Sequence, residues 1–189
     1  MENEKKQKSK LGEFLRDVII ALVLATVILM LFKPVIVKQH SMEPNFYGGD
    51  YLIVSRQAYS IFGDPATGDI IVFKTELTDE EGNNKSLIKR IIGCPGDTVE
   101  IRAGYVYLNG ELLDEPYLMD QGLSGEMDQV TIPEGMYFCC GDNRAVSNDS
   151  RGSEVGLVAE EDIIGKVVLR LYPFDRINTF EARLSGDIN

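Results

Sequence analysis

The stretch Ser86-Leu87-Ile88-Lys89-Arg90-Ile91-Ile92, which runs into Gly93-Cys94-Pro95-Gly96-Asp97, says most about the fold of this chain. It is typical of a β-strand that ends at Gly93, because glycine and proline interrupt strands. Alternate residues of a strand share a face, so Lys89 lies between Leu87 and Ile91 on one face. Such a lysine is either a solvent-facing residue of an edge strand that prevents aggregation, or a buried amine with a lowered pKa.

Short apolar runs separated by turn signals recur along most of the remaining sequence. Eighteen glycines and seven prolines in 189 residues favour β-structure over a helix bundle. Asn109-Gly110 after Tyr105–Leu108 predicts a two-residue hairpin turn, and the polar residues 75–86 predict an exposed loop. Further predicted strands are 51–54, 70–73, 99–101, 130–132, 136–140 and 165–172. We therefore expect a mainly β fold.

An apolar segment precedes this region. From Val18 to Val37 the one charged residue is Lys33, whose ammonium can extend to the interface of a bilayer. About 20 apolar residues suffice for a helix to cross the membrane. A cleaved signal peptide is disfavoured because no small-x-small motif follows the segment. A buried helix of a soluble protein is the other alternative, and we expect an uncleaved transmembrane anchor over residues 18–37.

Basic residues gather on the N-terminal side of this anchor. Residues 1–17 contain Lys5, Lys6, Lys8, Lys10 and Arg16. By the positive-inside rule, this basic segment is cytoplasmic. We expect a single-pass protein of the cell membrane, with residues 38–189 on its outer face.

Charge and composition exclude several kinds of partner and cofactor. The chain has 19 basic and 30 acidic residues, of which residues 1–37 hold six and four. Residues 38–189 therefore carry a net charge of −13, which opposes binding to nucleic acid. His40 is the single histidine, and Cys94, Cys139 and Cys140 form no Cys-x-x-Cys pair, so no zinc or other cofactor is expected. The cysteines are interpreted as small buried hydrophobic residues.

Ser41 follows the apolar segment closely, in Ser41-Met42-Glu43-Pro44. It is either a turn serine before Pro44 or a nucleophile, and a nucleophilic serine needs a base. His40 is adjacent in sequence, but neighbouring residues of an extended chain point to opposite faces. His40 therefore cannot easily reach the Ser41 hydroxyl, which disfavours a Ser-His-Asp triad. A lysine can serve instead if its pKa falls from about 10.4 by two or more units, which burial can supply. Lys89 meets that requirement if it is buried.

A polar segment from Gly141 to Arg151 follows the apolar run 136–140. It is either a surface loop or a part of the site placed at the end of a core strand. Asp149 and Arg151 could form an ion pair that holds the segment rigid, and Ser147 could orient a neutral lysine.

These segments together resemble type I signal peptidases, also called leader peptidases. The shared order is an anchor, Ser-Met-x-Pro at 41–44, Gly-Asp-[apolar]₃-Phe at 68–73, Lys-Arg-x-x-Gly-x-Pro-Gly-Asp at 89–97, and Gly-Asp-Asn-Arg-x-x-Ser-x-Asp-Ser-Arg at 141–151. Residues 165–177 are similar to the last core strand of the family. The resemblance implies an antiparallel β-sheet catalytic domain with a small inserted β subdomain, about 98–135.

The resemblance also implies a role for each matching residue. Ser41 would be the nucleophile and Lys89 its general base. Ser147 would hydrogen-bond the lysine amine, and Asp149 and Arg151 would form a supporting ion pair. The Ser41 N–H would bind the oxyanion. Gln39 stands where some members supply a second donor through a hydroxyl, and Ala145 stands where the family often has aspartate.

The substrate implied by the resemblance is the signal peptide of an exported preprotein, cleaved after a small-x-small site. Matching motif positions suggest Val35, Val37, Met42 and Ile88 as pocket residues. Membrane lipid is an expected partner, and the protein-export channel is expected nearby. The other readings are a self-cleaving repressor with the same dyad, which the anchor and the acidic charge oppose, and an anchored β-domain acting as a receptor or scaffold.

Overall fold

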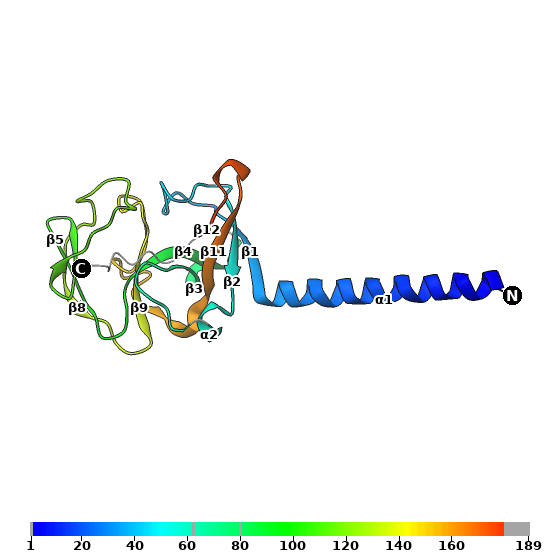
Figure 1. Cartoon of the computed structure of the whole chain (residues 1–189). Helices are drawn as coiled ribbons and strands as arrows, with labels where there is room; N and C mark the ends of the chain where they lie inside the picture. The colour runs from blue at the N-terminus through cyan, green and yellow to red at the C-terminus, as the bar shows by residue number, and fades with distance from the viewer. Residues whose placement is uncertain (1, 62, 80, 180–189) are drawn as a thin grey trace, which may run out of the picture.

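The computed structural model describes residues 2–61, 63–79 and 81–179, and the side chains of 12–60, 63–79 and 81–178. One long N-terminal helix leads into a domain built from two antiparallel sheets of eight and four strands (Figure 1). The expected mainly β fold with an inserted β subdomain is confirmed.

The larger sheet has the strand order β1-β2-β11-β3-β4-β9-β10, with β12 beside β11. Its members are β1 (Phe32–Ile36), β2 (Tyr51–Ser55), β3 (Ile70–Thr78), β4 (Asn84–Gly93), β9 (Met136–Cys140), β10 (Val158–Ala159), β11 (Ile163–Tyr172) and β12 (Asn178–Thr179). The short elements α2 (Ala58–Ile61), η1 (Glu160–Asp162) and η2 (Phe174–Arg176) lie between its strands in the sequence.

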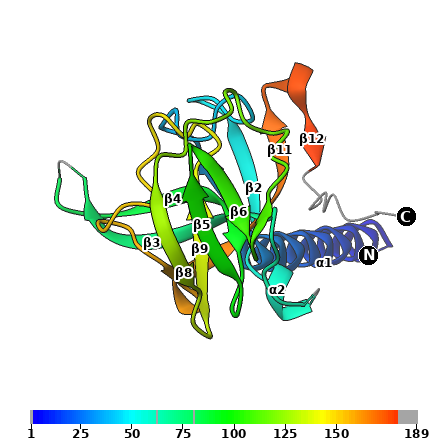
Figure 2. The same cartoon turned by 90° about the vertical axis from the view of Figure 1, so that its left-hand side faces the viewer.

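The smaller sheet is inserted between β4 and β9 and has the order β7-β6-β5-β8. It consists of β5 (Thr98–Arg102), β6 (Tyr105–Leu108), β7 (Glu111–Leu112) and β8 (Met127–Thr131). Asn109 and Gly110 both adopt positive φ angles between β6 and β7, so the predicted hairpin turn is confirmed. This sheet lies at the end of the molecule away from the long helix (Figure 2).

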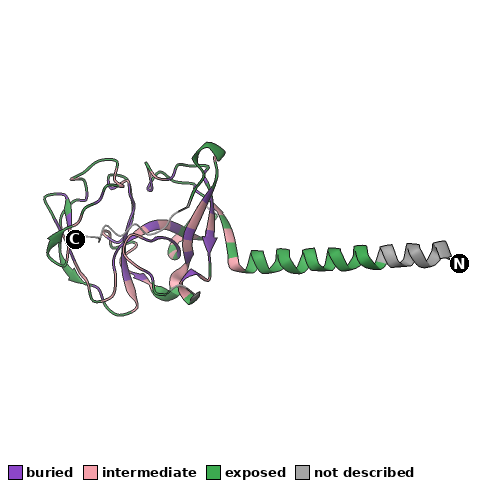
Figure 3. Ribbon diagram, in the orientation of Figure 1, coloured by how far each residue is buried: buried purple, intermediate pink, exposed green. Residues whose placement is uncertain are grey.

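The N-terminal helix α1 (Glu2–Leu31) ends earlier than the expected anchor. Its part from Gly12 to Leu31 is 20 residues long, has a mean hydropathy of 2.5 and contacts no core (Figure 3). Residues 32–36, which we expected to continue the anchor to Val37, instead form β1 and pair with β2. The reason is local, because Pro34 has no N–H to donate and its ring is incompatible with a helix interior.

The polar segment 75–86 is a second difference from the sequence interpretation. It forms the end of a long hairpin instead of a loop, since β3 continues to Thr78 and β4 begins at Asn84. Asp79 closes the tip by accepting hydrogen bonds from the backbone N–H groups of Asn83 at 2.8 Å and Glu81 at 3.0 Å. Backbone pairing thus extends the strands beyond their apolar residues.

Three groups of buried apolar side chains hold the two sheets in place. One lies under β1, β2 and β3 and includes Met42 and Phe46. A second packs between β3, β4 and β9 around Ile71 and Ile91. The third joins β9 to the smaller sheet. The centre of β4 therefore lies among apolar side chains, which fixes its residues and excludes water.

Candidate active site

Ser41 lies in the tight turn that follows β1. The backbone N–H of Phe46 donates to the carbonyl of Met42 at 2.9 Å, and both side chains are buried in the core. Val37, at the start of this segment, is also buried and bonds to Asp50 through its N–H at 3.0 Å. These contacts fix Ser41, whose surface is only 8% exposed.

Lys89 lies in the middle of β4 and is 1% exposed, so it is not a solvent-facing lysine. Its Nζ is 2.7 Å from Ser41 Oγ, across 48 residues of sequence. The strand partner of Lys89 is Ile71 on β3, and Ile71 is fully buried. The structure therefore brings the two predicted residues into direct contact in a buried position.

The Lys89 amine is tuned towards its neutral form. Burial lowers its pKa from 10.5 to about 8, while the negative charge of Asp149 and, less strongly, Asp142 opposes that change. A lysine with this pKa is partly neutral near pH 8 and can accept a proton.

His40 is directed elsewhere. Its Nδ1 is 2.7 Å from Glu43 Oε1, and 73% of its side chain is exposed. The expectation that the histidine adjacent to Ser41 faces away from the serine agrees with this geometry. It leaves Lys89 as the titratable group that contacts the Ser41 hydroxyl in the described part of the chain.

The segment 141–151 closes over this pair. Asn143 donates from its backbone N–H to the carbonyl of Ser41 at 3.0 Å. Asp149 accepts from the N–H of Gly141 at 3.0 Å and pairs with Arg151 through Nε at 2.7 Å and Nη2 at 2.9 Å. This pairing lowers the pKa of Asp149, although burial opposes it. The carboxylate thus stays ionised beside Lys89.

Ser147 does not make the hydrogen bond that we expected. Its Oγ is buried but forms no hydrogen bond of normal geometry with any described atom. It lies against Gly141, where a Cβ would be 2.3 Å from it, and near enough to Asp149 to help lower the pKa of that carboxyl. The Lys89 amine is directed to Ser41 instead, so Ser147 is adjacent to the site without contacting the amine.

Three residues from outside the 141–151 segment support it, and the sequence interpretation missed their role: Glu115, Ser124 and Arg90. Within the segment, Arg144 pairs with Glu115 and donates to Ser124 Oγ at 2.6 Å, and Arg144, Glu115 and Ser124 are all buried. Arg90 pairs with Asp142 through two bonds of 2.8 and 2.9 Å. Glu115 and Ser124 come from an acidic stretch with no strand pattern, so no signal marked them. No group of three metal-ligating side chains occurs among the described residues.

A groove of about 470 Å³ begins at Ser41 and runs between β1 and β4. All four predicted pocket residues line it: Val35, Val37, Met42 and Ile88. Its walls are strand edges, since β1 pairs only with β2, and residues 84–88 of β4 pair with β3 on one side alone in the described structure. An extended chain fits such a groove because both edges offer backbone donors and acceptors.

Comparison with known proteins identifies the family of this chain. A family model described as signal peptidase, peptidase S26, matches residues 11–172. This chain belongs to the signal peptidase family S26. It is a serine peptidase by that membership, and the buried serine at the end of its groove is consistent with it.

Two curated relatives of this S26 peptidase match it over nearly their whole length. A signal peptidase I from Bacillus licheniformis is 35% identical over 93% of this chain and 96% of its own. Signal peptidase I T from Bacillus subtilis is 34% identical over 92% of this chain and 93% of its own. A crystal structure of a signal peptidase I from Enterococcus faecalis has 34% identity and a TM-score of 0.46, and covers 55% of this chain and 96% of that one.

Proposed function

We propose that this protein removes signal peptides from exported preproteins, with Ser41 as nucleophile and Lys89 as general base. The observation that carries the proposal is the 2.7 Å contact between Ser41 Oγ and Lys89 Nζ, in a buried position at the end of a groove. The relatives named signal peptidase I supply the substrate class.

The chemistry follows from a neutral Lys89. Its amine takes the proton of Ser41 as Oγ attacks the scissile carbonyl carbon, and the carbonyl oxygen becomes an oxyanion. The C–N bond then breaks, and the lysine ammonium gives its proton to the leaving amine. Water next attacks the ester on Ser41, again with Lys89 as base. Release of the carboxylate product restores the serine hydroxyl.

The oxyanion needs hydrogen-bond donors next to Ser41. We assign the backbone N–H of Ser41 to this task. Gln39 lines the same groove two residues earlier, so its side-chain amide can supply a second donor. Ser147 does not contact the Lys89 amine in this structure, but its buried hydroxyl has no hydrogen-bond partner among the described residues, so we assign it to the neutral amine when that amine turns from Ser41 during the reaction.

We infer that the substrate lies extended between β1 and β4 and adds main-chain hydrogen bonds to both edges. Val35, Val37, Met42 and Ile88 would then surround the side chains at −1 and −3. Met42 is 1% exposed and Val37 4% exposed, so little free space surrounds them. This explains a requirement for small residues at the two positions.

We place α1 in the cell membrane, with residues 1–17 in the cytoplasm and the β-domain on the outer face. The short connection from Leu31 to Ser41 keeps the groove near the bilayer. Exposed aromatic and apolar side chains at one end of the larger sheet suit contact with lipid. These are Ile36, Tyr51, Tyr172, Phe174 and Ile177. An active site close to the outer surface of the membrane also lies near an export channel that delivers preproteins.

The proposal is tested by cleavage of a preprotein with a small-x-small site, followed by mass spectrometry of the product. The wild type should cut after that site, and Ser41→Ala should not. His40→Ala is the matched control and should retain most activity, since His40 pairs with Glu43 and not with Ser41. Cleavage by Ser41→Ala at the wild-type rate would rule the proposal out.

A further inference from the structure

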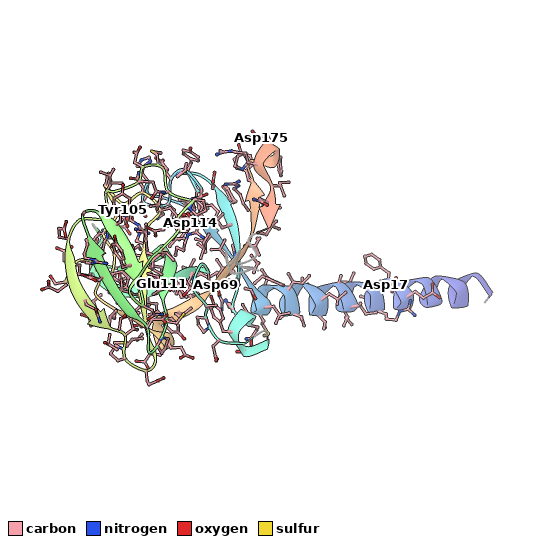
Figure 4. All side chains as sticks on the ribbon, turned by 60° about the vertical axis from the view of Figure 1, so that its left-hand side comes forward. Asp17, Asp69, Tyr105, Glu111, Asp114 and Asp175 are labelled. Carbon is pink, nitrogen blue, oxygen red and sulfur yellow. The ribbon has the colours of Figure 1, made fainter. Side chains whose placement is uncertain are left out.

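Glu115 belongs to none of the segments that identify the family, yet it is one of the most buried carboxylates in the described part of the chain, with 4% of its surface exposed. It lies in the stretch between β7 and β8, which leaves the smaller sheet and reaches the active site. Figure 4 labels Glu111 and Asp114, which precede it. A buried carboxylate is costly, so its position needs an explanation.

Both carboxylate oxygens of Glu115 accept hydrogen bonds from Arg144. Arg144 Nη2 donates to Oε1, and Nη1 donates to Oε2 at 3.2 Å. Tyr117 adds a hydrogen bond from its hydroxyl to Oε1 at 2.8 Å. Arg144 in turn donates from Nε to the carbonyl of Gly141 at 3.0 Å. A Cβ on Gly141 would lie 2.4 Å from the carbonyl oxygen of Ser41, so this series of contacts from Glu115 reaches the backbone of the nucleophilic residue.

This pair belongs to a group of three connected buried ion pairs, two of which contain Asp142 and Asp149, the carboxylates that act on Lys89. The other two are Arg90 with Asp142 and Arg151 with Asp149, and each arginine side chain is at most 15% exposed. The pairs touch one another, because Arg151 Nη2 donates to the carbonyl of Arg144 at 2.9 Å and Arg90 stacks on the ring of Tyr117. Three carboxylates and three guanidinium groups sum to zero charge.

Lys89 is the unbalanced member of this cluster. Asp142 and Asp149 face it from the 141–151 segment, Cys139 and Cys140 from β9, and Ser41 from the turn after β1. Its partner on β3 is the apolar Ile71, and Arg90 follows it on β4. Each nearby carboxylate already neutralises an arginine. Protonation of Lys89 therefore adds an uncompensated positive charge to a buried cluster.

We propose that Glu115 is a positioning residue that acts through Arg144: it completes a charge-neutral shell of three ion pairs, and this neutrality sets the pH range in which Lys89 serves as base. The proposal rests on the proposed function. Loss of the Glu115 charge leaves the shell with one positive charge, which favours neutral Lys89. Loss of Arg144 leaves one negative charge, which favours the protonated form. The two variants should therefore shift the pH dependence in opposite directions.

The test is the pH profile of kcat/KM between pH 6 and pH 10 for the full chain in detergent, on a preprotein substrate. Glu115→Gln should move the acidic limb to lower pH, by on the order of half a pH unit. Arg144→Gln should move it to higher pH, since Tyr117 still stabilises the ionised Glu115. The double variant Glu115→Gln/Arg144→Gln restores neutrality and should return the limb to the wild-type pH.

Glu111→Gln is the matched control, because Glu111 is an exposed carboxylate on β7, shortly before Glu115 in the sequence. Its limb should stay at the wild-type pH. If Glu115 had a purely structural role, Glu115→Gln would lower the maximum of kcat/KM and leave the acidic limb of the pH profile at the wild-type pH. That result would overturn the inference. Should Glu115→Gln fail to fold, an unmoved limb in Arg144→Gln would overturn it equally. A wild type that cleaves no preprotein would instead contradict the proposed function, and the inference would fall with it.

Discussion

Replacement of Lys89 by methionine should stabilise the folded protein at neutral pH while abolishing its activity. Burial lowers the Lys89 pKa from 10.5 to about 8. Below pH 8 the lysine is protonated in both the folded and unfolded states, and its full burial penalty is present. That penalty is about 3 kcal/mol, at about 1.4 kcal/mol for each pKa unit. Methionine has a similar length and no charge, so it removes the penalty.

The sign of the pH dependence follows from the same two pKa values. Between pH 8 and pH 10.5 the unfolded chain holds a proton that the folded chain has released, so the stability of the wild type rises with pH. The variant gains nothing over this range. Loss of the Ser41 hydrogen bond offsets about 1 kcal/mol of its advantage at every pH. The variant should therefore be more stable by about 2 kcal/mol at pH 7, and this advantage should disappear by pH 10.

Urea unfolding of the full chain in detergent measures this difference, with far-UV circular dichroism as the signal because the chain has no tryptophan. Lys74→Met is the matched control, since Lys74 is exposed on β3, and its difference from wild type should not depend on pH. A Lys89→Met variant that is less stable than wild type by the same amount at pH 7 and pH 10 would refute the account of a desolvated lysine.

The remaining predictions concern the supporting residues and the membrane. Asp149→Asn should lower kcat/KM at least tenfold, because it leaves Arg151 unpaired and frees the 141–151 segment. Arg151→Gln should have the same effect. If both variants kept activity within twofold of wild type, the ion pair would not support the active site. Ser147→Ala should move the acidic limb of the pH profile to higher pH, and an unmoved limb would exclude its contact with the neutral amine. Protease added to intact spheroplasts should digest residues 38–189 and spare an N-terminal tag, and the reverse pattern would contradict the proposed topology.

The contact between Ser41 and Lys89 was predicted by the family resemblance, because the residues alone left an alternative open for each of them. The alternation of β4 made a buried Lys89 possible, and the position of the single histidine disfavoured a histidine base. The motifs of the family, in their order, then decided between the alternatives. The predicted pocket residues line one groove because they lie close to Ser41 and Lys89 in the sequence. Val35 is on β1, Val37 and Met42 are in the segment that carries Ser41, and Ile88 precedes Lys89 on β4.

Other features depended on long-range pairing that a single sequence does not reveal. The anchor was extended too far because Val35, Ile36 and Val37 continue its apolar character. Pro34 marks the end of the helix, but only the pairing with β2 identifies residues 32–36 as a strand. Residues 75–86 were read as a loop because their strands are polar. Glu115 was missed because its partner Arg144 lies 29 residues away in the sequence, with the strands β8 and β9 between them.

The central claim is that neutral Lys89 is the base for Ser41, and the pH profile of kcat/KM for the wild type tests it most directly. With the Lys89 pKa at about 8, the rate should rise close to tenfold per pH unit well below pH 8 and level off above it. The profile is measured from pH 5 to pH 10 with the full chain in detergent and a signal-peptide substrate. An optimum near pH 5, or a flat profile from pH 5 to pH 9, would contradict a lysine base.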